Sequence, residues 1–272
     1  MASSVLFGKS SRALTAYAAV FALVLYLPIV LIPLFSFNSG VYVRFPLEGF
    51  TWDWYRDLAA RAPLHAAFVN SVQVGLVVAL ISTALAIPAA KAIARYRLPG
   101  KGPIVAFIML PLVVPGLIFG VAMLTLLNSL GVPRTLWTVA AGHVALCLPF
   151  AIFTLLPRFE GYDRSLDEAS ADLGENAWWT FWRITFPMIL PGVLASLLLT
   201  FTISFDEFIL AFFLSGTQAT LPMYIWSQLR FPQDFPSLLA LAALILVFSF
   251  VMVFASLKIS GFGRPTSREA AE

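Results

Sequence analysis

The sequence predicts an all-α integral membrane protein that crosses the bilayer six times. Of its 272 residues, 60% are hydrophobic and only 11% are charged, whereas an average soluble domain carries about 25% charged residues. The charged residues are also separated by long uncharged runs. A helix that crosses the hydrocarbon core needs roughly 20 apolar residues, and several of these runs reach that length. Lipid is therefore the expected solvent for most of the chain.

Charged side chains are costly at the membrane centre, so the uncharged runs locate the spans. The expected spans are residues 13–37, 66–90, 104–127, 136–156, 188–214 and 237–257. The first is too long for the apolar part of a signal peptide and is expected to be an uncleaved helix. A further uncharged run, from Glu207 to Arg230, contains Ser215-Gly216-Thr217 and Pro222, which are typical of loops. It is expected to form an external surface loop or re-entrant loop.

The distribution of basic residues predicts the orientation, because Lys and Arg accumulate on the cytoplasmic side. With the N-terminus inside, twelve of the 17 basic residues lie in inner segments and five in outer ones. Six spans then place both termini in the cytoplasm. The first loop, residues 38–65, and the loop between the fifth and sixth spans lie outside.

One inner loop, residues 157–187, is much longer than neighbouring spans require. Ser165 and Glu168 have the spacing of a capping box, and Gly174 is expected to end the helix that follows. A second short helix is predicted over residues 176–184, and Pro187 is expected to separate it from the fifth span. The residues alone leave two interpretations open: a rigid docking surface for a soluble partner, or an amphipathic helix at headgroup depth.

The loop also resembles the cytoplasmic signature of permease subunits of ABC importers. That signature is Glu-Ala-Ala, then Gly after three residues, then Ile-x-Leu-Pro after nine more. Here it reads Glu168, Ala169, Ser170, Gly174, Ile184 and Pro187. Ser170 stands where Ala is usual and Phe186 where Leu is usual. The resemblance assigns these six residues to ATPase coupling.

Two further segments, SFDEFILAFFLSG (204–216) and TLPMYIWSQLR (220–230), resemble the polyamine branch of these permeases. The resemblance covers residues 63–258, which it implies are the permease domain of a type I ABC importer fold. Residues 1–62 then supply the first helix and external loop, and residues 259–272 a cytoplasmic tail.

The resemblance also implies the setting in which the chain works. It implies a second, non-identical permease subunit, two cytoplasmic ATPase subunits and an external solute-binding protein. The location would be the bacterial inner membrane, embedded in the lipid bilayer. No cofactor, metal site or nucleic-acid partner is expected, and ATP hydrolysis is expected on a separate chain.

Adjacent acids near the end of the fifth span, Asp206 and Glu207, are candidates for contact with the solute, because ionisable residues inside spans are commonly functional. Paired carboxylates would suit the ammonium groups of spermidine or putrescine, and Ser204 and Tyr224 are weaker candidates nearby. The alternative is that both acids lie at the outer headgroup level.

Other functions fit less well. A gradient-driven transporter would explain the hydrophobicity but not the long inner loop, and the sequence shows no inverted repeat. A membrane enzyme needs clustered His, Asp or Glu, whereas His65 and His143 are far apart. The segment Ser3–Ser10 lacks the first glycine of a phosphate-binding P-loop. Within the importer class, an opine or amino-acid derivative remains an alternative solute.

Overall fold

A computed structural model describes residues 12–261, and the N-terminal segment that includes Ser3–Ser10 lies outside the described residues, as does most of the tail 259–272. The described part is helical throughout its length apart from loops and one isolated bridge between Asn38 and Phe50. It divides into two units: one contains the chain up to Arg61 together with the chain from Ser227, and the other is Ala62–Trp226.

Five helical segments within residues 12–261 are long and apolar enough to cross a membrane, and a bent pair brings the number to six if it counts as one span. The five are Leu14–Ser36, Ala62–Arg95, Leu136–Glu160, Ala177–Asp206 and Pro232–Phe250. The predicted number of spans thus agrees with the structure, while several boundaries do not.

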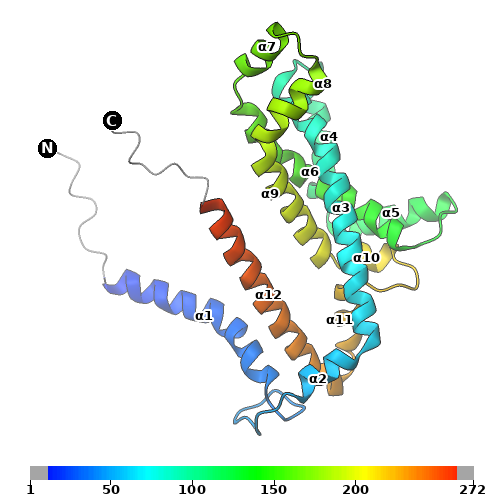
Figure 1. Cartoon of the computed structure of the whole chain (residues 1–272). Helices are drawn as coiled ribbons and strands as arrows, with labels where there is room; N and C mark the ends of the chain where they lie inside the picture. Colours follow the sequence, from blue (N-terminus) through cyan, green and yellow to red (C-terminus); the bar gives the residue numbers. More distant parts are fainter. Residues whose placement is uncertain (1–11, 262–272) are drawn as a thin grey trace. The chain divides into compact units, whose positions relative to one another are not determined.

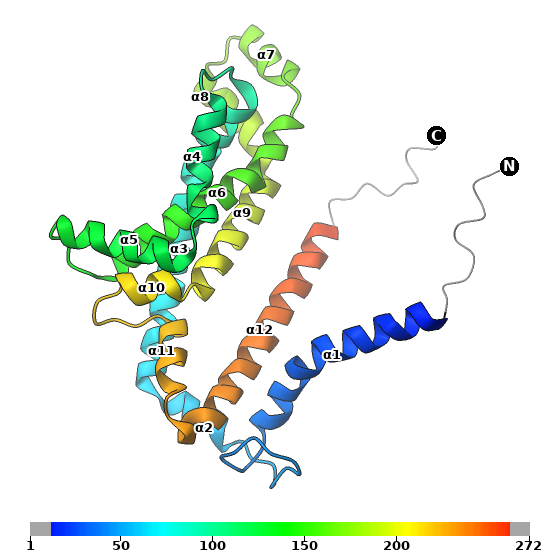
Figure 2. The same cartoon turned by 180° about the vertical axis from the view of Figure 1, so that it is seen from behind.

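Three long helices form the centre of the second unit: α3 (Ala62–Arg95), α6 (Leu136–Glu160) and α9 (Phe186–Asp206). Each packs against the other two, and both Figure 1 and Figure 2 show the three helices side by side. Small residues face these contacts, which lets the backbones approach closely. A hydroxyl pair joins two of the helices, because Thr83 Oγ1 and Ser196 Oγ lie 2.9 Å apart. The main core cluster is Ala86, Ala90, Ile93, Ala151, Ile152, Leu155, Phe159, Ile189 and Val193.

The expected span over residues 104–127 is present as a broken helix rather than as one continuous helix. The chain forms α4 (Lys101–Val113) and α5 (Gly116–Ser129), which are bent by 102°. The break falls at Val114, whose backbone is extended (φ −73°, ψ 127°) and which precedes Pro115. The residue before a proline is pushed out of the helical region by steric clash, which explains where the helix ends.

The expected fifth span, residues 188–214, is wrong at both ends. Its helix starts earlier, since residues 177–206 form one helical segment, and it stops at Asp206. The extended backbone of Glu207 interrupts the helix, and α10 (Ile209–Leu214) begins separately. Glu207 Oε1 accepts hydrogen bonds from the amides of Ile209 (2.8 Å) and Leu210 (3.1 Å). The side chain therefore starts a new helix at the point where the old one ends.

A loop and the short helix α11 (Leu221–Gln228) follow α10. They are tied to the start of α3, because Ser71 Oγ accepts from the Leu221 amide at 2.8 Å and Asn70 Nδ2 donates to the Ala219 carbonyl at 2.9 Å. Residues 215–220 form a loop, as their sequence indicates, but the short helix α11 that follows was not predicted.

The first unit contains α1 (Arg12–Ser36), α2 (Asp53–Ala60), the 3-10 turn η2 (Pro232–Asp234) and α12 (Phe235–Gly261). The helix α12 contacts both α1 and α2. The helix α2 was not expected, since residues 38–65 were predicted to be one loop. The described residues of α1 leave large apolar side chains exposed along most of its length.

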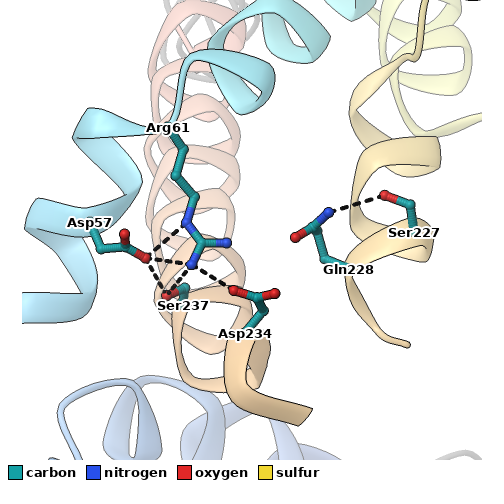
Figure 3. A network of polar contacts seen from close by, with 6 residues as sticks. All are labelled: Asp57, Arg61, Ser227, Gln228, Asp234 and Ser237. Atoms are coloured by element: carbon teal, nitrogen blue, oxygen red, sulfur yellow. Dashed lines mark hydrogen bonds and ion pairs between the residues drawn. The ribbon is translucent and has the colours of Figure 1, made fainter. Parts of the chain in front are cut away.

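A polar network fixes α2 to the beginning of α12 (Figure 3). Arg61 donates to Asp57 Oδ2 at 2.8 Å and to Asp234 Oδ1 at 2.7 Å. Ser237 Oγ donates to the same Asp57 oxygen at 2.9 Å. Burial opposes ionisation of Asp57, but the hydrogen bonds from Arg61 and Ser237 outweigh it and lower the pKa of the carboxyl. We call these four residues the Arg61 network.

Candidate functional site

The segment between α6 and α9, residues 161–185, forms the two short helices labelled α7 and α8 in Figure 1. We call it the α6–α9 loop. Its first helix, α7 (Ser165–Asp172), ends in a Schellman arrangement: the Glu175 amide donates to the Ser170 carbonyl and the Gly174 amide to the Ala171 carbonyl. Gly174 has φ +83°, a conformation that costs a glycine little. The predicted helix terminator is confirmed.

The predicted capping box is wrong. Ser165 is the first residue of α7 rather than its N-cap, and the N-cap residue, Arg164, makes no side-chain cap hydrogen bond. Asp163 acts instead, because its Oδ1 accepts from the Ser165 amide at 3.0 Å. This hydrogen bond lowers the pKa of Asp163. An acceptor two residues earlier therefore satisfies the start of the helix.

The second helix begins where the sequence indicates, but Pro187 does not separate it from the span. The helix α8 (Ala177–Thr180) runs into the π-helix η1 (Phe181–Thr185) and then directly into α9. In the π-helix the Phe186 amide donates to the Phe181 carbonyl, five residues back. Because this wider turn shifts the hydrogen-bond pattern next to Pro187, the missing amide of that proline does not stop the helix.

The start of α8 is fixed by Asn176, whose Oδ1 accepts from the amides of Trp178 (3.1 Å) and Trp179 (3.0 Å). A buried hydroxyl pair then joins the two short helices, with Ser170 Oγ 2.8 Å from Thr180 Oγ1. The position at which the sequence departs from the family's alanine therefore supplies an interhelical hydrogen bond. An ion pair between Glu175, just before α8, and Arg183 in η1 adds a further contact within the loop.

The remaining signature residues divide into an exposed group and a supporting group. Glu168 and Ala169 are exposed on α7, and Leu173 beside them is 85% exposed. Ser170 is buried, Ile184 is half-buried, and Pro187 is exposed at the start of α9. Two exposed residues of α7, an acid and a small residue, are thus followed by an exposed apolar side chain at the end of the helix. A surface of this composition suits a protein partner, because apolar groups bury area and a small residue permits close approach.

Asp167 connects this loop to its surroundings, which the sequence did not reveal. Its Oδ1 accepts from the Tyr162 hydroxyl at 2.5 Å and from Thr185 Oγ1 at 3.3 Å. Burial and the hydrogen bond to Asp167 raise the pKa of Tyr162 to about 12. Tyr162 is five residues from Asp167 but Thr185 is eighteen away, so only the folded loop brings all three together.

The four candidates for the solute pathway lie near the end of α9 and in α11. Ser204 is buried and its Oγ lies 2.9 Å from His143 Nδ1 on α6, so it joins two helices. Glu207 caps α10, as described above. Tyr224 is buried in α11. Asp206 alone has an exposed side chain, at the last residue of α9.

Comparison with known proteins identifies the family. Residues 82–258 match the model for "Binding-protein-dependent transport system inner membrane component". The spermidine/putrescine transport system permease protein PotC of Haemophilus influenzae is 32% identical over 85% of this chain and 90% of its own length. The putrescine transport system permease protein PotI of Escherichia coli is 34% identical, over 82% of this chain and 81% of its own.

The fold is similar to a solved structure as well. A bacterial ABC transporter involved in the import of the acidic polysaccharide alginate contains a chain that matches with a TM-score of 0.70 at 18% identity. The match covers 89% of this chain and 94% of the other. At that identity the likeness concerns the fold. The family match over most of the α3–α12 region, with the identity to PotC and PotI, establishes that this chain belongs to the binding-protein-dependent transport system inner membrane components, the permease subunits of ABC importers.

Proposed function

We propose that this permease imports a polyamine such as spermidine or putrescine. The observation that carries the proposal is the identity to PotC and PotI, which extends over more than four fifths of the chain. Their names specify spermidine and putrescine transport. The proposed assembly contains a second, non-identical permease, two ATPase subunits that hydrolyse ATP, and an external solute-binding protein. The exposed apolar surface of α1 supports a place for that helix against lipid and a partner permease.

The proposed orientation has both termini in the cytoplasm, as the basic residues indicate. Residues 63–258 would then form the permease domain, and the coupling loop 157–187 would face the ATPases. In this proposal Glu168 and Ala169 make the contact, while Ser170, Gly174, Ile184 and Pro187 hold the contacting helix in shape. The capped, hydrogen-bonded structure of the α6–α9 loop supports a rigid docking element.

Exchange of charge on α7 tests the docking proposal. We expect Glu168→Arg to abolish association with the ATPase subunits in a pull-down from membranes, with normal membrane insertion. Asp53→Arg is the matched control, because Asp53 is an exposed acid on α2 with a side chain 74% exposed. Normal association and transport by Glu168→Arg would contradict the docking assignment.

We further propose that Asp206 contacts the solute as it passes, with Glu207, Ser204 and Tyr224 shaping its surroundings. Asp206 is the exposed carboxylate of this group, and it lies at the C-terminal end of α9, where the helix dipole adds negative potential. A cationic solute would be attracted there. The alternative position at the outer headgroup level predicts no effect on uptake.

Uptake measurements test both the solute and the residue. A strain without its own polyamine importers, supplied with this complete system, should accumulate labelled putrescine or spermidine. We expect Asp206→Asn to lower the initial rate about tenfold, which corresponds to about 1.4 kcal/mol. Asp53→Asn should leave the rate unchanged. Absence of uptake by the wild-type system would overturn the polyamine proposal, and an unaffected Asp206→Asn variant would overturn the role of that carboxylate.

A further inference from the structure

Four elements of the second unit meet at the base of α7. Tyr162 follows α6, Asp167 lies on α7, and Thr185 is the last residue of η1 where it joins α9. Arg95 is the last residue of α3 and donates to the Tyr162 carbonyl. We call Arg95, Tyr162, Asp167 and Thr185 the Asp167 brace.

The contacts in the brace are close and mostly buried. Asp167 Oδ1 accepts from both hydroxyls, and Tyr162 and Thr185 are only 6% and 1% exposed. The Arg95 guanidinium lies 5.1 Å from the centre of the Tyr162 ring, within the range of a cation–π contact. Arg164, just before α7, donates back to the Arg95 carbonyl at 3.0 Å. The end of α3 is therefore joined to the α6–α9 loop by several contacts.

The hydrogen bond of Ser170, also on α7, connects different parts of the chain. Ser170 connects α7 to Thr180 on α8, within the same loop. The carboxylate of Asp167, by contrast, accepts from residues that adjoin α6 and α9 and reaches α3 through Tyr162. A displacement of α7 that preserves these contacts must move the ends of three core helices with it.

We propose that Asp167 is a positioning residue that transmits the displacement of α7 to α3, α6 and α9 during the transport cycle. The inference rests on the proposed function, in which α7 is the helix that the ATPases displace. A hydrogen bond to a charged group is stronger than one between neutral groups. The brace makes the connection rigid where backbone alone would leave α7 free to tilt.

The test separates coupling from docking. The complete importer is reconstituted in proteoliposomes, and ATPase association, ATP hydrolysis and putrescine uptake are measured on the same preparation. Tyr162→Phe removes one oxygen from the brace. We expect association and hydrolysis to stay within about twofold of wild type, while uptake per ATP hydrolysed falls about tenfold, the effect of losing one charge-assisted hydrogen bond.

Three variants complete the test. Tyr96→Phe is the matched control, because Tyr96 follows Arg95 but is 61% exposed, and it should behave as wild type. Asp167→Asn keeps an acceptor oxygen and should retain more coupling than Asp167→Leu, which has none. Equal uptake per ATP in wild type, Tyr162→Phe and Asp167→Leu would overturn the brace. Failure of the wild-type chain to bind the ATPases would instead overturn the proposed function.

Discussion

The Arg61 network and the Asp167 brace both attach a short helix to a long one, but their carboxylates have different hydrogen-bond donors. In the Arg61 network a guanidinium lies between the carboxylates of Asp57 and Asp234, so that opposite charges compensate each other. In the brace, the hydrogen bonds to the carboxylate of Asp167 come from two hydroxyl groups.

The difference has consequences for strength and for geometry. Charge compensation makes the Arg61 network strong but tolerant of small shifts, because Coulomb attraction falls off slowly with distance. Hydroxyl donors depend on distance and angle, and they weaken steeply when misaligned. The first arrangement suits a fixed attachment of α2 to α12. The second suits a contact whose geometry must be reproduced accurately, as a transmitting element requires.

The largest expected effect is that of Arg61→Ala, because it leaves two partly buried carboxylates without their cation. Breaking a buried ion pair costs about 3–5 kcal/mol, and the 42% exposure of the Asp57 side chain reduces this. We expect a loss of about 2 kcal/mol, measured as a lower melting temperature of the purified complex in nanodiscs.

Arg56→Ala is the control for that measurement. The Arg56 side chain is 81% exposed and pairs with Asp53, which is 74% exposed, and exposed pairs contribute about 0–1 kcal/mol. Equal melting temperatures for Arg61→Ala and Arg56→Ala would show that the Arg61 network is not a strong attachment.

The two regions should lose stability at opposite ends of the pH scale. The pKa of Asp57 is lowered in the fold, so its contribution is present above its ordinary value of about 4 and is lost as the pH falls through the folded value. The pKa of Tyr162 is raised to about 12, so its contribution is complete below about 10 and is lost as the pH rises towards 12. Acid should loosen α2, and alkali should loosen α7.

The mobility of nitroxide labels can report how firmly each helix is held. The labels are placed at Arg56→Cys on α2 and at Leu173→Cys beside α7, because both native side chains are exposed. We expect label mobility to rise in acid at position 56 and in alkali at position 173. Asp57→Asn should remove the first transition and Tyr162→Phe the second. A single transition common to both labels would mean that the regions do not differ as described.

The spans were predictable from sequence because charged side chains are costly in lipid, so each span lacks them along its length. This constraint does not depend on tertiary contacts. The bend at Val114 was not predicted, although Pro115 is visible, because prolines inside spans also occur in helices that merely kink. Pro187 was expected to break a helix that in fact continues, since the sequence does not reveal the π-helix before it.

The candidate site was predictable to the extent that its residues are local. Gly174 ends α7 through backbone hydrogen bonds within six residues, which the spacing indicates. The brace could not be predicted, because Arg95 is 67 residues from Tyr162 and Thr185 is 18 from Asp167. Such contacts depend on how α3, α6 and α9 pack, and no local pattern encodes that.

A smaller effect is expected from Asn176→Ala, which removes the acceptor at the start of α8. Loss of an N-terminal cap costs about 1 kcal/mol, so the α6–α9 loop should be cut faster by a protease added to the solubilised complex. Asn176→Asp keeps an acceptor oxygen and should be cut at the wild-type rate. An unchanged rate for Asn176→Ala would indicate that the brace alone keeps the loop folded.

The smallest expected effect is that of Ser170→Ala, which restores the residue usual in the family. The variant loses the hydroxyl contact to Thr180, but Thr180 Oγ1 also donates to the Asn176 carbonyl at 3.1 Å and is not left without an acceptor. With no buried group unsatisfied, the cost is that of a neutral hydrogen bond, about 0.5–1 kcal/mol. Proteolysis of the loop should rise slightly while uptake per ATP stays at the wild-type value, because the Ser170 contact connects α7 only to α8. If uptake per ATP fell as far as in Tyr162→Phe, stiffness within the loop, rather than its attachment to α3 and α9, would be what transport requires.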